Sequence, residues 1–153
     1  MTVRVGINGF GRIGRNFWRA AAASGKDIEI VAVNDLTSPE VLAHLLKYDS
    51  ILGVLSEDVA ADGEGIKISG NTMKVLSERD PGALPWGDLG VDVVIESTGR
   101  FTTAETAGGH RQGGAKKVIS GASASLPLDL ALGRDLAPAL GLLGQEAREF
   151  DRR

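Results

Sequence analysis

Three glycines near the start of the chain have the spacing that holds a phosphate group. A short apolar run at 3–7 is typical of a buried strand, Gly9, Gly11 and Gly14 follow it, and residues 13–23 favour a helix. In such a unit the first glycine permits a tight turn, the second lets the backbone approach an anion, and the third lets the helix pack against the strand. Free N–H groups and a partial positive charge at the helix N-terminus attract the same anion. The sequence therefore predicts a turn that binds a dinucleotide pyrophosphate.

An acidic residue follows the next predicted strand, at a characteristic spacing from the glycine turn. Residues 28–33 are β-branched and mostly apolar, so we expect a strand that is buried on both faces and ends at Asn34 and Asp35. Asp35 lies 21 residues after Gly14, the spacing at which a carboxylate reaches the hydroxyls of an adenosine ribose. A carboxylate there repels a 2′-phosphate, which favours NAD over NADP. The alternative is that Asp35 is a turn residue that caps the next segment.

Other chemically capable side chains carry weaker signals. Arg12 and Arg15 fall in the first helical turn, where they could neutralise phosphate charge or simply be solvated, and we expect solvation for Arg15. His44 has no second imidazole at metal-ligand spacing and His110 is far away in sequence, so no metal site is predicted. Glu96 closes a buried strand, where it could be a buried acid with a role of its own, but we expect a capping or salt-bridging carboxylate there.

Composition limits the classes of function. The net charge of −3 argues against a general nucleic-acid or membrane-surface binder, and 42% apolar with 24% charged residues is ordinary for a globular protein. The chain has no cysteine, which removes disulfides, thiolate metal sites and a cysteine nucleophile from these residues. No apolar run approaches the roughly 18 residues of a membrane span, and the first residues do not resemble a signal peptide. We therefore expect a cytoplasmic location.

Strand and helix patterns alternate through the rest of the first 119 residues. The predicted elements are a helix from Ser38-Pro39, a loop at 47–50, a hairpin turning at Gly70-Asn71, a loop at 81–90, a strand at 91–96, a helix at 103–112 and a strand at 116–119. Two adjacent glycines inside the segment 103–112 weaken that helix. This order predicts an α/β fold of the Rossmann type: a doubly wound, mostly parallel sheet with helices on both faces and an inserted β-hairpin.

The residue types change abruptly after Ile119. Residues 120–153 contain no Ile, Val, Lys, Met, Tyr, Trp or Thr. We assign 1–119 to one nucleotide-binding domain and 120–153 to a divergent tail without a consistent structural role. The narrow residue set suggests a hypothesis, that the tail is an out-of-frame translation of GC-rich coding sequence. The nucleotide sequence after codon 119 tests it.

Several blocks between residues 5 and 119 together resemble glyceraldehyde-3-phosphate dehydrogenase. The blocks are VGINGFGRIGR at 5–15, VNDL at 33–36, HLLKYDS at 44–50, Gly53, VLSERDP at 75–81, PW at 85–86, VIESTG at 94–99, Phe101 and GAKKVI at 114–119. Such a set is far more specific than the glycine triplet alone. The resemblance implies the NAD-binding Rossmann domain of an oxidoreductase of glycolysis and glucose metabolism.

The resemblance also implies which residues touch NAD. In the family pattern the turn holds the pyrophosphate, Asp35 the adenosine ribose and Arg79 the adenine side, while 97–99 line the cofactor groove. Ser120 stands near the place of a family serine that also touches the cofactor, one residue early. The predicted cofactor-binding residues are Gly9, Phe10, Gly11, Arg12, Ile13, Asn34, Asp35, Arg79, Ser97, Thr98, Gly99 and Ser120.

The catalytic half of the family pattern has no counterpart in these 153 residues. The family uses a cysteine nucleophile in a Ser-Cys-Thr-Thr-Asn motif, activated by a histidine, and this chain has no cysteine. We assign no catalytic residue and expect NAD binding without turnover by this chain alone. The alternatives are a stand-alone regulatory or partner-binding NAD module and a non-functional frameshifted fragment. Association with a second copy or with a full-length relative stays open.

Overall fold

The computed structural model describes residues 1–120, so the predicted tail lies outside the described residues except for Ser120. The strands are β1 Val3–Asn8, β2 Ile28–Asn34, β3 Tyr48–Asp49, β4 Gly53–Val54, β5 Val59–Asp62, β6 Gly65–Ile68, β7 Asn71–Leu76, β8 Val93–Glu96 and β9 Lys117–Ser120. The helices are α1 Arg12–Ala23, α2 Pro39–Lys47, α3 Ala104–Ala107 and α4 Gly109–Gln112, with a 3₁₀ turn, η1, at Pro81–Ala83. Among these helices none is long and apolar enough to cross a membrane.

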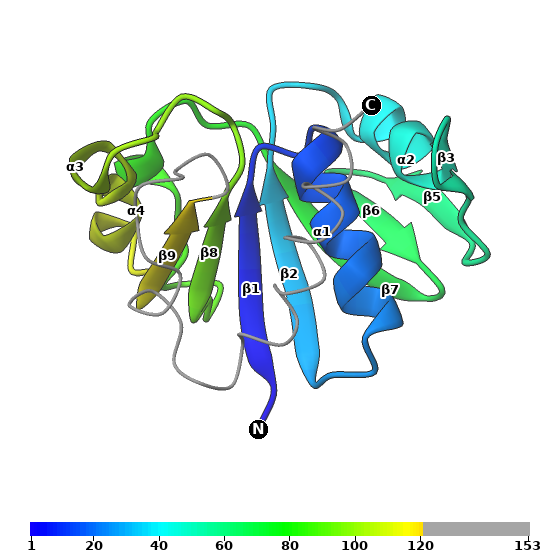
Figure 1. Ribbon diagram of the computed structural model, residues 1–153, viewed down its shortest axis with the longest axis horizontal. Coiled ribbons are helices and arrows are strands. Elements are labelled where there is room, and N and C mark those ends of the chain that lie inside the picture. The colour runs from blue at the N-terminus through cyan, green and yellow to red at the C-terminus, as the bar shows by residue number, and fades with distance from the viewer. Residues whose placement is uncertain (121–153) are drawn as a thin grey trace, which may run out of the picture.

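Seven strands form one sheet in the order β5-β6-β7-β2-β1-β8-β9 (Figure 1). The five strands from β7 to β9 run parallel, and β5 and β6 add an antiparallel edge. This arrangement confirms the predicted Rossmann-type α/β sheet with its inserted hairpin. The chain crosses from β1 to β2 in one direction and later places β8 on the other side of β1. The switch between β1 and β8 is where doubly wound sheets bind their ligands.

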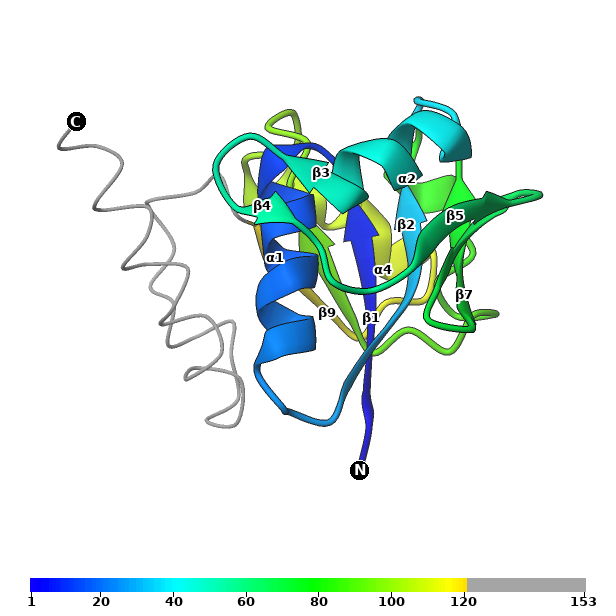
Figure 2. The ribbon, with the colours of Figure 1, turned by 90° about the vertical axis from the view of Figure 1, so that its right-hand side faces the viewer.

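Each face of the sheet carries its own apolar core. Helix α1 lies across one face (Figures 1 and 2), where its Phe17 and Trp18 join Leu42 and Leu46 of α2 in the larger core cluster. On the other face a smaller cluster gathers around the fully buried Trp86. All four residues of β8 are buried, and its side chains alternate between the two faces: Val93 and Ile95 join the larger cluster and Val94 joins the smaller one.

Gly6 explains how Trp86 reaches the middle of the sheet. In β1 the neighbours Val5 and Ile7 face the larger cluster, so Gly6 faces the other side. A Cβ built on Gly6 would lie 2.5 Å from the Trp86 ring. The missing side chain therefore makes room for the indole directly above the central strand.

Three local predictions were wrong in detail. The predicted loop at 47–50 contains β3, which pairs antiparallel with β4. The hairpin turns at Ser69 and Gly70 rather than at Gly70-Asn71, with φ of +48° and +91°, the positive values that the tight hairpin turn requires. The predicted helix 103–112 is divided into α3 and α4 at Gly108, where a weak helix former interrupts it.

Two further predictions were partly right. Strand β2 is fully buried only over its last three residues, while Glu29 is exposed. The predicted loop 81–90 contains η1, and Asp80 caps this turn by accepting a hydrogen bond from the amide of Gly82.

Truncating Leu46 should test the packing of α2 against the sheet. Leu46 is fully buried in the larger cluster, whereas Leu52 has an exposed side chain. We expect Leu46→Ala to lower the free energy of unfolding by about 3 kcal/mol, since it leaves a cavity. The matched Leu52→Ala variant should change it by less than about 0.5 kcal/mol. Urea unfolding of both variants measures this difference, and equal losses would contradict the described packing.

Candidate nucleotide-binding site

The glycine turn after β1 is held by close backbone contacts. Gly9 has φ of +88°, and its amide donates to the carbonyl of Asn34 at 2.8 Å. A Cβ on Gly9 would lie 2.7 Å from the amide nitrogen of Thr98, and a Cβ on Gly14 would lie 2.2 Å from the carbonyl oxygen of Gly9. The protein's own packing therefore requires glycine at both positions.

Gly11 differs from its two neighbours in the motif. A Cβ built there meets nothing within 4 Å among the residues described. Gly11 is the N-cap of α1, no side chain caps this helix end, and its first turn has no acidic residue. Backbone N–H groups and the positive end of the helix dipole therefore face an open space. This arrangement fits a phosphate group that approaches the bare backbone at Gly11.

Asp35 is fixed beside the turn by two backbone amides. One carboxylate oxygen accepts from the amide of Phe10 at 2.9 Å, and the other accepts from the amide of Thr37 at 2.9 Å. Asp35 is thus the turn-capping residue of the alternative prediction and also closes the glycine turn. Each carboxylate oxygen can accept more than one hydrogen bond, so both can still bind ribose hydroxyls. The side chain of Phe10 is fully buried, which leaves only its backbone for a ligand.

Arg15 is buried, and the prediction of a solvated side chain was wrong. Only 9% of the residue is exposed, and its guanidinium donates to the carbonyl of Phe10 at 2.9 Å. Burial, together with the nearby Arg12, lowers the pKa of Arg15 while Asp49 and Asp35 oppose that shift. Its Nε–H has no partner among the described residues. Arg15 therefore stabilises the glycine turn from the protein interior, through the carbonyl of Phe10, instead of facing a phosphate.

Arg12 lies at the rim of the turn. Its side chain is 47% exposed, and one guanidinium nitrogen lies 3.3 Å from the carboxylate of Asp49. The amide of Leu52, then that of Ile51, and Arg12 itself hold the pKa of Asp49 below its usual value against the effect of burial. Ile13, next to Arg12, is half exposed. Arg12 remains accessible to an anion at the helix end.

The segment after β8 forms the other wall of the site. The amide of Ser97 donates to the carbonyl of Asn8 at 2.8 Å, and its hydroxyl donates to the carbonyl of Gly9 at 2.6 Å. The amide and the hydroxyl of Thr98 donate to one carboxylate oxygen of Glu96 at 2.8 and 2.5 Å. Gly99 follows with φ of +73°. The turn 97–99 therefore lies directly against the glycine turn.

Glu96 is a buried carboxylate with a full set of donors. Its second oxygen accepts from the amide group of Asn8 at 2.6 Å and lies 2.7 Å from Nε2 of His110. Burial alone would raise the pKa of Glu96, but hydrogen bonds from His110, Thr98 and Asn8 outweigh it and hold the pKa below its ordinary value. The prediction of a capping or salt-bridging carboxylate is confirmed. His110, which is fully buried, had no sequence signal for this role.

Asn34 positions the segment that leads to Arg79. Its amide group donates to the side-chain oxygen of Asn8 at 2.7 Å and to the carbonyl of Glu78 at 2.8 Å, and its oxygen accepts from the amide of Glu78 at 2.8 Å. These partners lie within the protein, so Asn34 acts on the site through its neighbours. The exposed Arg79 follows Glu78 at the same edge.

The residues predicted to bind the cofactor all lie at or after the carboxyl ends of the parallel strands. The glycine turn follows β1, Asp35 follows β2, Arg79 follows β7 and the turn 97–99 follows β8. Ser120 ends β9 in register with Glu96. The structure thus brings the set together at one edge of the sheet, around the switch between β1 and β8.

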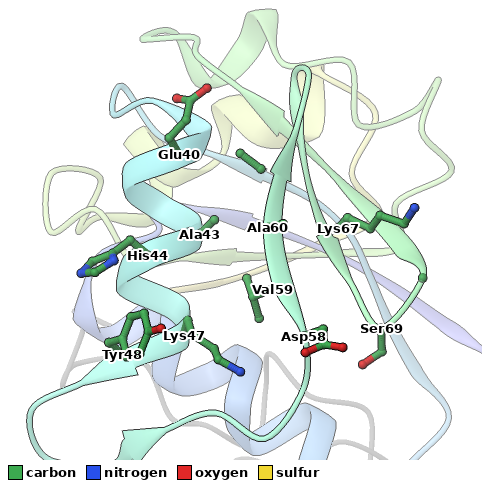
Figure 3. Close-up of a pocket in the computed structure, with 12 residues that line it drawn as sticks. Glu40, Ala43, His44, Lys47, Tyr48, Asp58, Val59, Ala60, Lys67 and Ser69 are labelled. Atoms are coloured by element: carbon green, nitrogen blue, oxygen red, sulfur yellow. The ribbon is translucent and has the colours of Figure 1, made fainter.

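A separate hollow lies between α2 and the hairpin of β5 and β6 (Figure 3). Its volume is about 820 Å³, and none of the predicted cofactor-binding residues lines it. Acidic and basic side chains are mixed there, and Lys47 already donates to the carbonyl of Glu57 at 2.8 Å. The hollow therefore offers no convergent charge and shares no residue with the candidate nucleotide-binding site.

Comparison with known proteins agrees with this geometry. The family model described as "Glyceraldehyde 3-phosphate dehydrogenase, NAD binding domain" matches residues 3–104. Similar relatives include glyceraldehyde-3-phosphate dehydrogenase 1 of Streptomyces arenae, 61% identical over 142 residues, which are 93% of this chain and 40% of the relative. Glyceraldehyde-3-phosphate dehydrogenase 1 of Streptomyces avermitilis is 67% identical over 125 residues, 82% of this chain and 37% of the relative.

A relative from another genus, the glyceraldehyde-3-phosphate dehydrogenase of Geobacillus stearothermophilus, is 57% identical over 124 residues, 81% of this chain and 37% of the relative. The chain thus spans about 40% of the length of the curated relatives it matches. The family model covers well over half of the chain, and its residues include the glycine turn, Asp35 and the turn 97–99. The chain belongs to the glyceraldehyde 3-phosphate dehydrogenase NAD-binding domain family, whose cofactor is NAD.

Proposed function

We propose that this chain binds NAD at the carboxyl edge of its parallel strands, as the cofactor-binding part of an oxidoreductase that acts on glyceraldehyde 3-phosphate. The observation that carries the proposal is the open backbone at Gly11, beside an uncapped helix end and next to the fixed carboxylate of Asp35. An anion site and a ribose acceptor side by side are the two requirements for holding an adenine dinucleotide.

Each part of the dinucleotide is matched by a group on the protein. The backbone at Gly11 and the N-terminus of α1 bind the pyrophosphate, with Arg12 supplying positive charge at the rim. Asp35 accepts hydrogen bonds from the adenosine ribose, and Arg79 lies on the adenine side. The turn 97–99 and Ser120 line the groove on the far side of the switch between β1 and β8. Bound NAD supplies the hydride acceptor, and these residues bind and orient it.

The proposal separates cofactor binding from chemistry. The 153 residues contain no cysteine, so they cannot form the thioester on which the family's aldehyde oxidation depends. We propose that this polypeptide holds NAD but does not oxidise aldehyde unaided. A cytoplasmic location and association with a second copy or a full-length relative belong to the same proposal. Exposed Ile51, Leu52 and Val54 are apolar side chains that such an association could bury.

Substitutions at two glycines should separate binding from folding. Gly11→Ala introduces a Cβ that touches no described protein atom, so the variant should fold with a loss of at most about 1 kcal/mol from the changed N-cap. It should still weaken NAD binding at least about tenfold, because the methyl group occupies the pyrophosphate position. Gly14→Ala should instead destabilise the fold, since its Cβ would lie 2.2 Å from the Gly9 carbonyl.

Thermal unfolding with and without NAD measures both effects. NAD at 100 times its dissociation constant should stabilise the unsubstituted chain by about 2.7 kcal/mol. A Gly11→Ala variant that binds NAD as tightly as the unsubstituted chain would contradict the proposed pyrophosphate position. An unsubstituted chain that NAD does not stabilise would contradict the proposed function itself.

The carboxylate of Asp35 should set the preference for NAD over NADP. Asp35→Asn removes the negative charge but keeps an oxygen that can accept from the Phe10 amide. We expect the ratio of NAD to NADP affinity to fall about tenfold, because a 2′-phosphate no longer meets a like charge. Calorimetric titration of both nucleotides measures the ratio. The exposed Asp62 provides the control, and Asp62→Asn should leave the ratio unchanged. A ratio that stays constant in Asp35→Asn would place the ribose elsewhere.

A further inference from the structure

A chain of hydrogen bonds links α4 to the wall of the nucleotide site. The indole Nε1–H of Trp86 lies 3.0 Å from Nδ1 of His110, and an indole nitrogen can only donate. Nδ1 therefore accepts, and the ring carries its proton on Nε2, which lies 2.7 Å from Glu96. Trp86 thus fixes the direction of the bond between His110 and Glu96, in which the imidazole donates to the carboxylate.

Glu96 divides its two oxygens between the interior and the site. One oxygen faces His110 and Asn8, and the other accepts both the amide and the hydroxyl of Thr98. Glu96 is 1% exposed, and a buried carboxylate is costly unless it is fully hydrogen-bonded. The donors on Asn8 and His110 therefore hold the charged carboxylate of Glu96 in place. Its other oxygen orients the turn 97–99 through Thr98.

The structure assigns His110 and Trp86 as positioning residues of the nucleotide site: through Glu96 they fix the backbone and hydroxyl of Thr98 where the cofactor binds. This inference rests on the proposed NAD site. Neither residue belongs to the predicted cofactor-binding set. Trp86 lies in the smaller core cluster, and His110 lies on α4. The ring of Phe101 packs edge-on against the imidazole of His110, with 6.3 Å between the ring centroids, which further restricts the orientation of the imidazole.

The same chain of bonds reaches the opposite side of the site. Asn8 donates to Glu96 and accepts from Asn34, the residue before Asp35. The imidazole thus contributes to the relative placement of the ribose acceptor and the turn 97–99. Loss of the donor at His110 should therefore weaken binding of the whole dinucleotide, although His110 itself makes no contact with it.

The first test needs no nucleotide. ¹⁵N NMR of the imidazole in the ligand-free chain distinguishes a proton on Nε2 from one on Nδ1. We expect the Nε2–H form at neutral pH, and slow hydrogen exchange of the Thr98 amide. A proton on Nδ1, or a Thr98 amide that exchanges as fast as an exposed one, would overturn the inference whether or not NAD binds.

The second test compares two substitutions with matched controls. His110→Gln keeps an N–H that can reach Glu96, whereas His110→Phe keeps the ring shape and removes it. We expect His110→Phe to weaken NAD binding about tenfold, the value of one lost hydrogen bond to a charged group, and His110→Gln to restore most of the affinity. His44 is an exposed histidine on α2, so His44→Gln and His44→Phe should leave binding unchanged.

Rescue by glutamine separates positioning from general packing, because glutamine fills the ring's space less well than phenylalanine. Equal NAD affinities for His110→Phe and the unsubstituted chain would overturn the inference. If His110→Phe does not fold, Trp86→Phe takes its place, since it removes the indole N–H that donates to Nδ1 and helps to orient the imidazole. That variant should keep the Nε2–H form, because the carboxylate of Glu96 can only accept, but it should weaken NAD binding, and an unchanged affinity would overturn the inference. An unsubstituted chain without NAD affinity would instead overturn the proposed function.

Discussion

The backbone of Gly14 lies so close to the carbonyl of Gly9 that a Cβ there would sit 2.2 Å from the oxygen. This close approach places the first turn of α1 directly over the carboxyl end of β1. The open N-terminus of the helix, the bare backbone at Gly11 and the rim position of Arg12 all follow from it. Arg15 secures the arrangement from the interior by binding the carbonyl of Phe10. The proposed anion site thus depends on packing that leaves no room for a side chain at Gly14.

The second constraint is a row of buried polar residues at the strand ends. Asn34, Asn8 and Glu96 are the last residues of β2, β1 and β8, and they stand beside one another in register. Their side chains bond across the row, from Asn34 to Asn8 and from Asn8 to Glu96. Each loop that leaves the sheet therefore starts from a fixed point. The row thus holds the turns that follow three strands in fixed positions relative to one another.

The geometry of the glycine turn and of Asp35 in the candidate site was predictable because its signals are local. The strand, the glycine turn and the helix are contiguous, and Asp35 lies at a fixed distance along one β-α-β unit. The row at the strand ends depends instead on residues far apart, such as Asn8 and Glu96, which are 88 positions apart. No periodicity or spacing pairs such residues. Arg15 was mistaken for a surface residue because its position in the first helical turn gives no sign that its guanidinium folds back onto the carbonyl of Phe10.

We propose that NAD binds at the carboxyl ends of the parallel strands and not in the hollow beside α2. The most direct measurement is ¹H–¹⁵N NMR of the labelled chain during titration with NAD. We expect the largest shifts on the amides of 10–13, Asp35 and the turn 97–99, with little change at residues that line the hollow, such as Ala60 and Lys67. Shifts concentrated at the hollow, or no saturable shifts at millimolar NAD, would contradict it.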